Sequence, residues 1–126
     1  MDFKDNKAIY LQIAERICDE ILFNKYMEEE RIPSVREYAS IVEVNFNTVM
    51  RSFEYLQSSE IIFNKRGIGY FVSKGAKKKI LSMRRIYFLE NEIQDFFRQL
   101  DMLGIPIEEI VGMYHQYVQQ KGKQSL

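Results

Sequence analysis

The fold is decided by residues 33–72, which read PSVREYASIVEVNFNTVMRSFEYLQSSEIIFNKRGIGYFV. The stretch opens with a helix start. The Ser34 side chain can accept from the Glu37 amide, while the Glu37 carboxylate accepts from the Ser34 amide, which is a capping box. The spacing of apolar residues then predicts a short helix from Val35 to about Val42.

A second predicted helix follows almost at once. Asn45 is a suitable N-cap, and apolar residues at Val49, Phe53 and Leu56 predict a helix that runs to about Ser59. Because only three or four residues separate the two helices, they cannot lie antiparallel. We therefore expect them to cross steeply, as in a helix-turn-helix.

A short hairpin completes the stretch. Residues 61–63 and 69–72 are β-prone runs, and Lys65-Arg66-Gly67 between them is a turn signal. Upstream, isoleucines at every fourth position predict a helix from about Lys7 to Phe23, with Cys18 as a buried thiol on its apolar side. The order helix, helix, helix, hairpin is that of a winged helix.

The chain becomes helical again from Gly75. A heptad-like stripe predicts one helix that ends at Gly104, and Pro106 at the first position begins another. Two helices cannot bury this much apolar surface alone, so the stripe predicts a homodimer interface formed by Ile86, Leu89, Ile93, Phe96, Leu100, Ile110, Tyr114 and Tyr117. Aromatic residues in such an interface could alternatively hold an unknown small-molecule effector, although stripes of this kind are more often core.

The expected fold class is thus α+β and mainly α. Residues 1–74 form a winged helix-turn-helix DNA-binding domain, and residues 75–126 form a two-helix C-terminal dimerisation hairpin. No apolar run is long enough to span a membrane, and the polar residues after Met1 do not resemble a secretory leader, so we expect a cytoplasmic protein.

Composition argues against catalysis. The chain has one histidine and one cysteine, which cannot assemble a zinc site of usual composition within one protomer, and no catalytic set is indicated around His115. We expect no enzyme activity, no metal and no cofactor. The net charge is zero, but residues 33–79 carry eight basic and four acidic side chains, a balance of +4. The basic charge therefore coincides with the predicted winged helix.

Candidate DNA contacts lie in three places. The N-terminal turn of the second helix of the pair offers Asn45, Asn47, Thr48 and Arg51, residue types that contact base edges or phosphates in a major groove. Arg36 lies beside free helix-terminal amides and could clamp a phosphate. The basic hairpin tip, Lys65, Arg66 and Gly67, could reach a minor groove.

Each feature has a plainer interpretation. Asn45 could only cap its helix, Arg36 could only pair with Glu37 or Glu43, and the tip could be a solvated turn. Phe46 could contact a thymine methyl or pack against the preceding helix. Lysines at positions 74, 77, 78 and 79 could bind phosphate or only keep the segment solvated. Each plainer interpretation is acceptable alone. That all of them hold together, in this order along the chain, is a weaker hypothesis than DNA binding.

Four motifs resemble the GntR family of bacterial regulators, in order and at family spacing, over about residues 8–73. They are Ala8 to Ala14, Ile32 to Glu37, Val44 to Val49 and Arg66 to Val72. The short two-helix tail resembles that of the YtrA-type subfamily, in which the tail serves dimerisation. The resemblance implies that Arg36, Asn45, Asn47, Thr48 and Arg66-Gly67 contact DNA, and helix geometry adds Arg51.

The sequence departs from this family where members usually carry glycine. Those places hold Asn24 to Glu30, Glu43 and Glu60. A turn with negative φ would tolerate Glu43, but an acidic side chain near DNA lowers affinity. The leading expectation is a homodimeric repressor that binds a pseudo-palindromic double-stranded operator. The rival is a winged-helix protein-interaction module without specific DNA binding.

Overall fold

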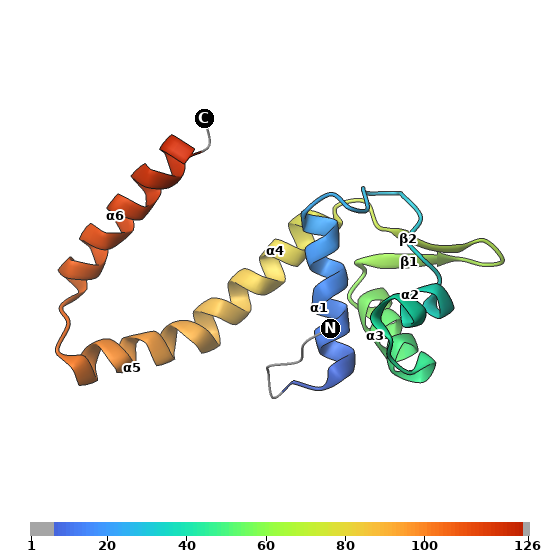
Figure 1. Cartoon of the computed structure of the whole chain (residues 1–126), viewed down its shortest axis with the longest axis horizontal. Helices are drawn as coiled ribbons and strands as arrows, with labels where there is room; N and C mark the ends of the chain where they lie inside the picture. The colour runs from blue at the N-terminus through green and yellow to red at the C-terminus, as the bar shows by residue number, and fades with distance from the viewer. Residues whose placement is uncertain (1–6, 125–126) are drawn as a thin grey trace. The chain divides into compact units, whose positions relative to one another are not determined.

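A computed structural model describes residues 7–124 (Figure 1). For Gln124 it describes the backbone alone. The polar residues after Met1, used above against a leader, lie outside this range. The elements in order are α1 (Ile9–Leu22), α2 (Val35–Val42), α3 (Phe46–Ser58), β1 (Ile62–Lys65), β2 (Gly69–Val72), α4 (Ala76–Tyr87), a π-helical turn η1 (Phe88–Glu92), α5 (Ile93–Leu103) and α6 (Ile107–Gln124). This order confirms the predicted fold class.

The core of the first compact unit, which ends at Met83, is built from the predicted stripes. Ile13, Ile17 and Ile21 of α1 are buried, and Cys18 lies beside them as a buried free thiol. From α2 and α3 the core receives Val35, Tyr38, Val42, Val49, Phe53 and Leu56. A buried serine also joins two helices, because the Ser52 hydroxyl donates to the carbonyl oxygen of Tyr10 at 2.7 Å.

Both predicted helix starts are confirmed. The Ser34 hydroxyl accepts from the Glu37 amide at 3.1 Å, and the Glu37 carboxylate accepts from the Ser34 amide at 3.2 Å. These bonds hold the pKa of Glu37 below its usual value. At the start of α3, the side-chain oxygen of Asn45 accepts from the Asn47 amide at 2.8 Å. Each cap satisfies an amide that has no partner inside its helix.

The turn between α2 and α3 contains Glu43. A negative φ was the condition under which the turn would tolerate Glu43 without strain, but its φ is +56° and it lies in the left-handed region. Its amide donates to Ala39, and the next amide, that of Val44, donates to the same carbonyl at 3.1 Å. This closure needs a left-handed residue just after the helix, which glycine adopts without strain and glutamate does not.

Glu43→Gly is therefore expected to stabilise the protein by about 1 kcal/mol, after allowance for the freer unfolded glycine chain. Thermal unfolding should show a rise in Tm of about 5 °C. Glu43→Gln is the matched control, because it removes the charge and keeps the strained φ. An equal rise in Tm for both variants would mean that charge, and not backbone strain, is the cause.

The hairpin β1–β2 is antiparallel, with Ile62 opposite Val72, Phe63 opposite Phe71 and Lys65 opposite Gly69. Its inner face joins the core, where the Phe53 ring meets Tyr70 edge-on with 5.0 Å between centroids. The hairpin, called the wing below, is thus fixed to the back of α3.

After the wing, α4 begins inside the same core. Ala76 and Ile80 are both buried there, and the compact unit ends only at Met83. The expected boundary between residues 74 and 75 separates a DNA-binding part from a dimerisation part, and this assignment stays a prediction. The sequence predicted one uninterrupted helix up to Gly104, but η1 interrupts it with a wider turn. Gly104 does end α5, with φ +68°, while Pro106 precedes α6 and is not its first residue.

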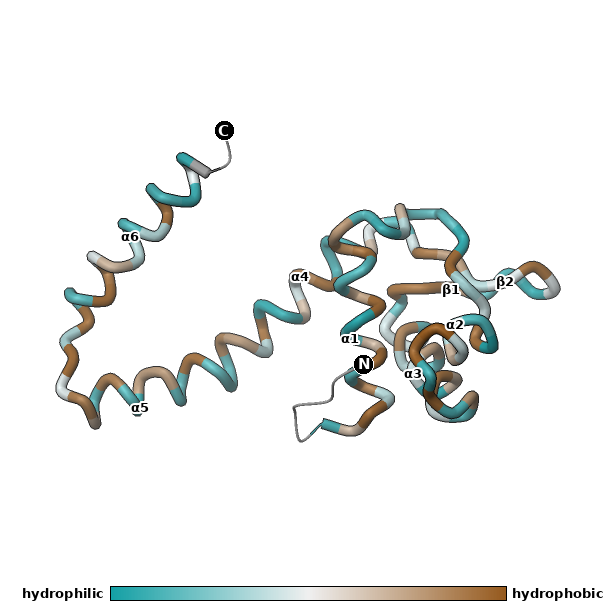
Figure 2. The backbone as a smooth tube through the Cα atoms, in the orientation of Figure 1, coloured by the Kyte–Doolittle hydropathy of each residue, from teal (hydrophilic) through white to brown (hydrophobic). Residues whose placement is uncertain are grey.

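The second unit begins at Arg84 and buries little of its own apolar surface. Figure 2 shows hydrophobic residues recurring along α5 and α6. Of the eight predicted dimerisation residues, only Leu100 is buried, and Ile93 and Ile110 are half-buried. The other five are exposed in the single chain: Ile86, Leu89, Phe96, Tyr114 and Tyr117. No helix among residues 7–124 is long and apolar enough to cross a membrane.

Candidate nucleic-acid interface

The first turn of α3 presents polar side chains to solvent. Asn47 is exposed and Thr48 is half-buried one residue later. Asn45 is also exposed, but its side-chain oxygen is used in the cap, so its amide nitrogen is the group left to donate. Asn47 and Arg51 are four residues apart and therefore share one helix face. This face is the part of α3 that can address base edges.

Arg51 is held by an aromatic ring of α1. Its guanidinium lies 4.2 Å from the centroid of Tyr10, and Tyr10 in turn meets Tyr55 edge-on at 6.5 Å. Stacking on a ring orients a guanidinium while its N–H donors remain free to bind at the ring's edge. The sequence identified Arg51 but gave no sign of Tyr10, because the contact joins helices that are far apart in the chain.

Arg36 of α2 is oriented in a similar way. Its guanidinium lies 5.7 Å from the centroid of the Phe46 ring, the first residue of α3. Phe46 is 40% exposed, so it packs partly against the preceding helix through this arginine. Glu37, one of the two acidic partners considered for Arg36, has its carboxylate on the Ser34 amide.

The wing tip is exposed and basic. The turn closes through a bond from the Ile68 amide to the Lys65 carbonyl at 2.8 Å, and Gly67 has φ +80°, which makes glycine the residue that fits. Lys65 and Arg66 are both exposed. The Lys65 ammonium lies 4.5 Å from the centroid of the Phe71 ring.

Two of the four lysines that follow the wing are already engaged. The Lys77 ammonium donates to Asn24, and the Lys79 ammonium pairs with Glu60 at 2.7 Å. Lys74 and Lys78 are exposed. For Lys77 and Lys79 the interpretation without a phosphate contact therefore fits best.

The loop before α2 also supplies an end cap for α4. The Glu28 carboxylate accepts from the amides of Gly75 at 2.7 Å and Lys77 at 3.4 Å, which holds the pKa of Glu28 below its usual value. This contact stabilises the fold above the usual glutamate pKa and is lost as the pH falls through the lowered value. It fixes the loop against the start of α4.

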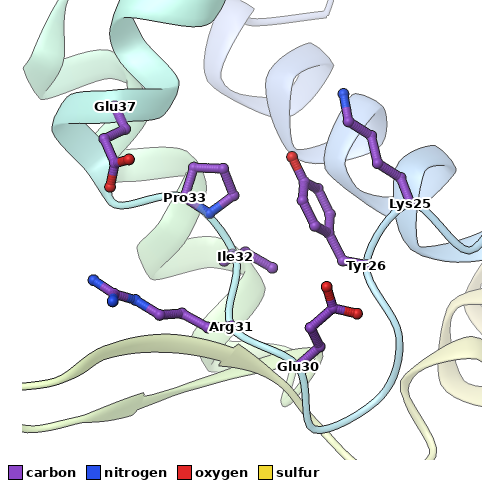
Figure 3. Close-up of a pocket in the computed structure, with 7 residues that line it drawn as sticks. All are labelled: Lys25, Tyr26, Glu30, Arg31, Ile32, Pro33 and Glu37. Atoms are coloured by element: carbon purple, nitrogen blue, oxygen red, sulfur yellow. The ribbon is translucent and has the colours of Figure 1, made fainter.

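An open hollow lies between the end of α1 and the start of α2 (Figure 3). It is lined by Lys25, Tyr26, Glu30, Arg31, Ile32, Pro33 and Glu37. Among residues 7–124, no group of three or more His, Cys, Asp or Glu side chains is arranged to hold a metal ion. The sequence did not single out Arg31, which this structure puts at the junction of the hollow and the wing.

A winged helix-turn-helix with polar and cationic groups on its second helix and wing tip defines a class of DNA-binding regulators. Residues 9–72 match the family described as bacterial regulatory proteins, gntR family. The chain belongs to this family and is a helix-turn-helix transcriptional regulator.

Individual relatives agree with this assignment. A GntR-family transcriptional regulator from Bacteroides thetaiotaomicron has a similar crystal structure, with 61% identity, a TM-score of 0.79, and coverage of 90% of this chain and 99% of that one. The regulator YhcF of Bacillus subtilis is 30% identical over 109 residues, 86% of this chain and 88% of its own. The repressor YtrA of the same organism is 24% identical over 120 residues, 95% of this chain and 88% of its own.

These findings confirm the family resemblance and its YtrA-type character. They also confirm the prediction that the chain is not an enzyme, because the family and these relatives are transcriptional regulators.

Proposed function

We propose that the chain is a cytoplasmic, homodimeric repressor that binds a pseudo-palindromic operator. The observation that carries the proposal is the pair of exposed arginines stacked on aromatic rings, Arg51 on Tyr10 and Arg36 on Phe46. A guanidinium fixed in this way loses little conformational freedom when it binds a base edge or a phosphate. The proposed base-contacting residues are Asn45, Asn47, Thr48 and Arg51, and the proposed backbone and wing contacts are Arg36, Lys65, Arg66 and Gly67.

The dimer is supported by the tail. Large apolar side chains are exposed in several of its helical elements, such as Leu89 of η1 at 46% and Tyr114 of α6 at 62%. Exposed apolar surface on this scale is typical of an interaction site, and most soluble oligomers are symmetric homodimers. Two copies would present two α3 helices to successive major grooves, about 10 bp or a multiple of it apart. The repressor assignment draws on the name of YtrA, a relative over most of the chain.

Selection of bound duplexes from a random pool tests DNA binding and half-site spacing together. We expect two inverted half-sites and affinity that falls steeply with salt, since lysines and arginines displace condensed counterions. Added to a template whose promoter overlaps the selected site, the protein should reduce transcription. A rise in transcription would replace the repressor assignment with that of an activator.

Replacing Arg36 and Arg66 together with alanine should weaken operator binding by about 1,000-fold or more while the dimer persists, because each contact contributes about 1–3 kcal/mol in each of the two half-sites, which adds to at least about 4 kcal/mol. Fluorescence anisotropy with the selected duplex measures the affinity, and sedimentation measures the dimer. The control is Lys25→Ala with Lys123→Ala, which removes two exposed cations elsewhere. If the Arg36 and Arg66 variant keeps full affinity, these two residues do not contact the operator. If the unaltered chain selects no duplex, the interaction-module hypothesis is favoured.

A further inference from the structure

The segment before α2, residues 29–32, pairs with the free edge of β2 in the wing. The Glu29 amide donates to the Val72 carbonyl at 2.7 Å, the Val72 amide donates to Glu30 at 2.9 Å, and the Ile32 amide donates to Tyr70 at 3.0 Å. In this ladder Arg31 lies directly opposite Phe71. The position of Arg31 is therefore fixed by backbone bonds on both sides of it.

The side-chain alternation of strands then places Arg31 on the outer face of the wing. Ile32, Ile62 and Val72 point inward, since all three are buried. Their neighbours point outward and form one surface, the wing outer face, made of Arg31, Phe63, Lys65, Gly69 and Phe71. Figure 3 shows Arg31 extending to the opposite side of its segment from Tyr26.

Gly69 makes room for the arginine. A Cβ at position 69 would lie 2.9 Å from Nε of Arg31, so the arginine would have to move away from the wing, and the φ of Gly69 is +146°. The guanidinium thus rests on bare wing backbone. Beside it, the Phe63 and Phe71 rings stack at 5.7 Å, and Lys65 lies over Phe71.

The wing outer face is positively charged, and its cationic groups are accessible to a ligand. Arg31 and Lys65 are both exposed, and within residues 7–124 no hydrogen bond or ion pair is found for the Arg31 guanidinium. Arg31 acts electrostatically on the Glu37 carboxylate, which is already bonded to the Ser34 amide. Two cations on a flat, partly aromatic sheet face suit a row of phosphates better than a base edge inside a groove.

We propose that the wing outer face, centred on Arg31 with Lys65, binds the sugar–phosphate backbone beside the groove that the wing tip enters. This inference rests on the proposed function and adds a second backbone-binding surface to it. Arg31 would supply one phosphate contact in each half-site and carry no sequence information itself.

The test is the salt dependence of operator binding for the full chain and its Arg31→Ala, Arg31→Lys and Lys25→Ala variants. Loss of one phosphate contact per half-site should reduce the slope of log affinity against log salt by about 0.9 for each copy, or about 1.8 for the dimer. The advantage of the wild type over Arg31→Ala should then shrink about tenfold between 50 and 200 mM salt. Lys25→Ala removes an equal charge on the far side of the hollow, where Lys25 pairs with Glu20.

We expect Arg31→Lys and Lys25→Ala to keep the wild-type slope and selected sequence. An unchanged slope for Arg31→Ala overturns the inference. So does an equal loss in Arg31→Lys, since that result would assign Arg31 a packing role against Gly69. A wild-type chain that binds no duplex overturns the proposed function itself, which separates the two failures.

Discussion

Phe53→Ala is expected to lower the free energy of unfolding of the winged unit by about 3–5 kcal/mol. The Phe53 ring is fully buried and meets two rings edge-on, Tyr38 of α2 at 6.2 Å and Tyr70 of β2 at 5.0 Å. Its removal leaves a cavity where the helix pair and the wing meet. Because domains of this size are stable by only about 5–15 kcal/mol, the variant should lose a large part of its stability.

Urea unfolding followed by circular dichroism, at one fixed protein concentration, measures this loss. The matched control is Phe23→Ala, which removes the same ring from a site that is 83% exposed. The control should change stability by less than about 0.5 kcal/mol. Similar losses in both variants would show that burial of the Phe53 ring between the helix pair and the wing does not stabilise the unit.

The sequence predicted the features that depend on local chemistry. The capping box of Ser34 and Glu37, the Asn45 cap and the end of α5 at Gly104 are each determined by residues a few positions apart. The apolar stripes were also recognisable, because helical periodicity is a local property. Together these signals were enough for the order of elements and for the family.

The sequence did not predict features that depend on distant segments. The Tyr10 ring under Arg51 and the pairing of Arg31 with Phe71 join parts of the chain that only the tertiary fold brings together. The φ of Glu43 was left open by the sequence, because the residue type disfavours the left-handed region while the turn geometry, set by tertiary packing, requires it. Lys77 and Lys79 were ambiguous for the same reason, since their partners Asn24 and Glu60 lie in other loops.

Between residues 7 and 124, four non-glycine residues have positive φ, and all lie in turns between elements: Asn24, Glu29, Glu43 and Glu60. Three of them are acidic, in a protein of zero net charge that is proposed to bind a polyanion. Glu60 is offset by Lys79, which holds the pKa of Glu60 below its usual value. Glu43 lies in the turn of the helix pair, so Glu43→Gly should raise DNA affinity as well as stability.

The double variant Leu89→Asp with Phe96→Asp is expected to abolish the dimer and weaken operator binding by about 100- to 10,000-fold. The two residues are exposed in the single chain, at 46% and 38%, and are two helical turns apart in the predicted seam. A carboxylate buried in an apolar interface without a partner is strongly unfavourable. Without the dimer, each copy binds a single half-site and loses the gain in effective concentration that the second half-site provides.

Sedimentation measures the dimer, and anisotropy with full and half operators measures binding. The control is Gln94→Asp, which adds a carboxylate at an exposed polar position of α5, the helix of Phe96. The control should remain dimeric and bind the full operator tightly, while the double variant should bind full and half operators with nearly equal, weak affinity. Both substituted residues lie beyond Met83, so the winged unit should keep its own thermal unfolding transition. A double variant that still sediments as a dimer would place the interface on another surface, and tight operator binding by a monomer would contradict the two-half-site model.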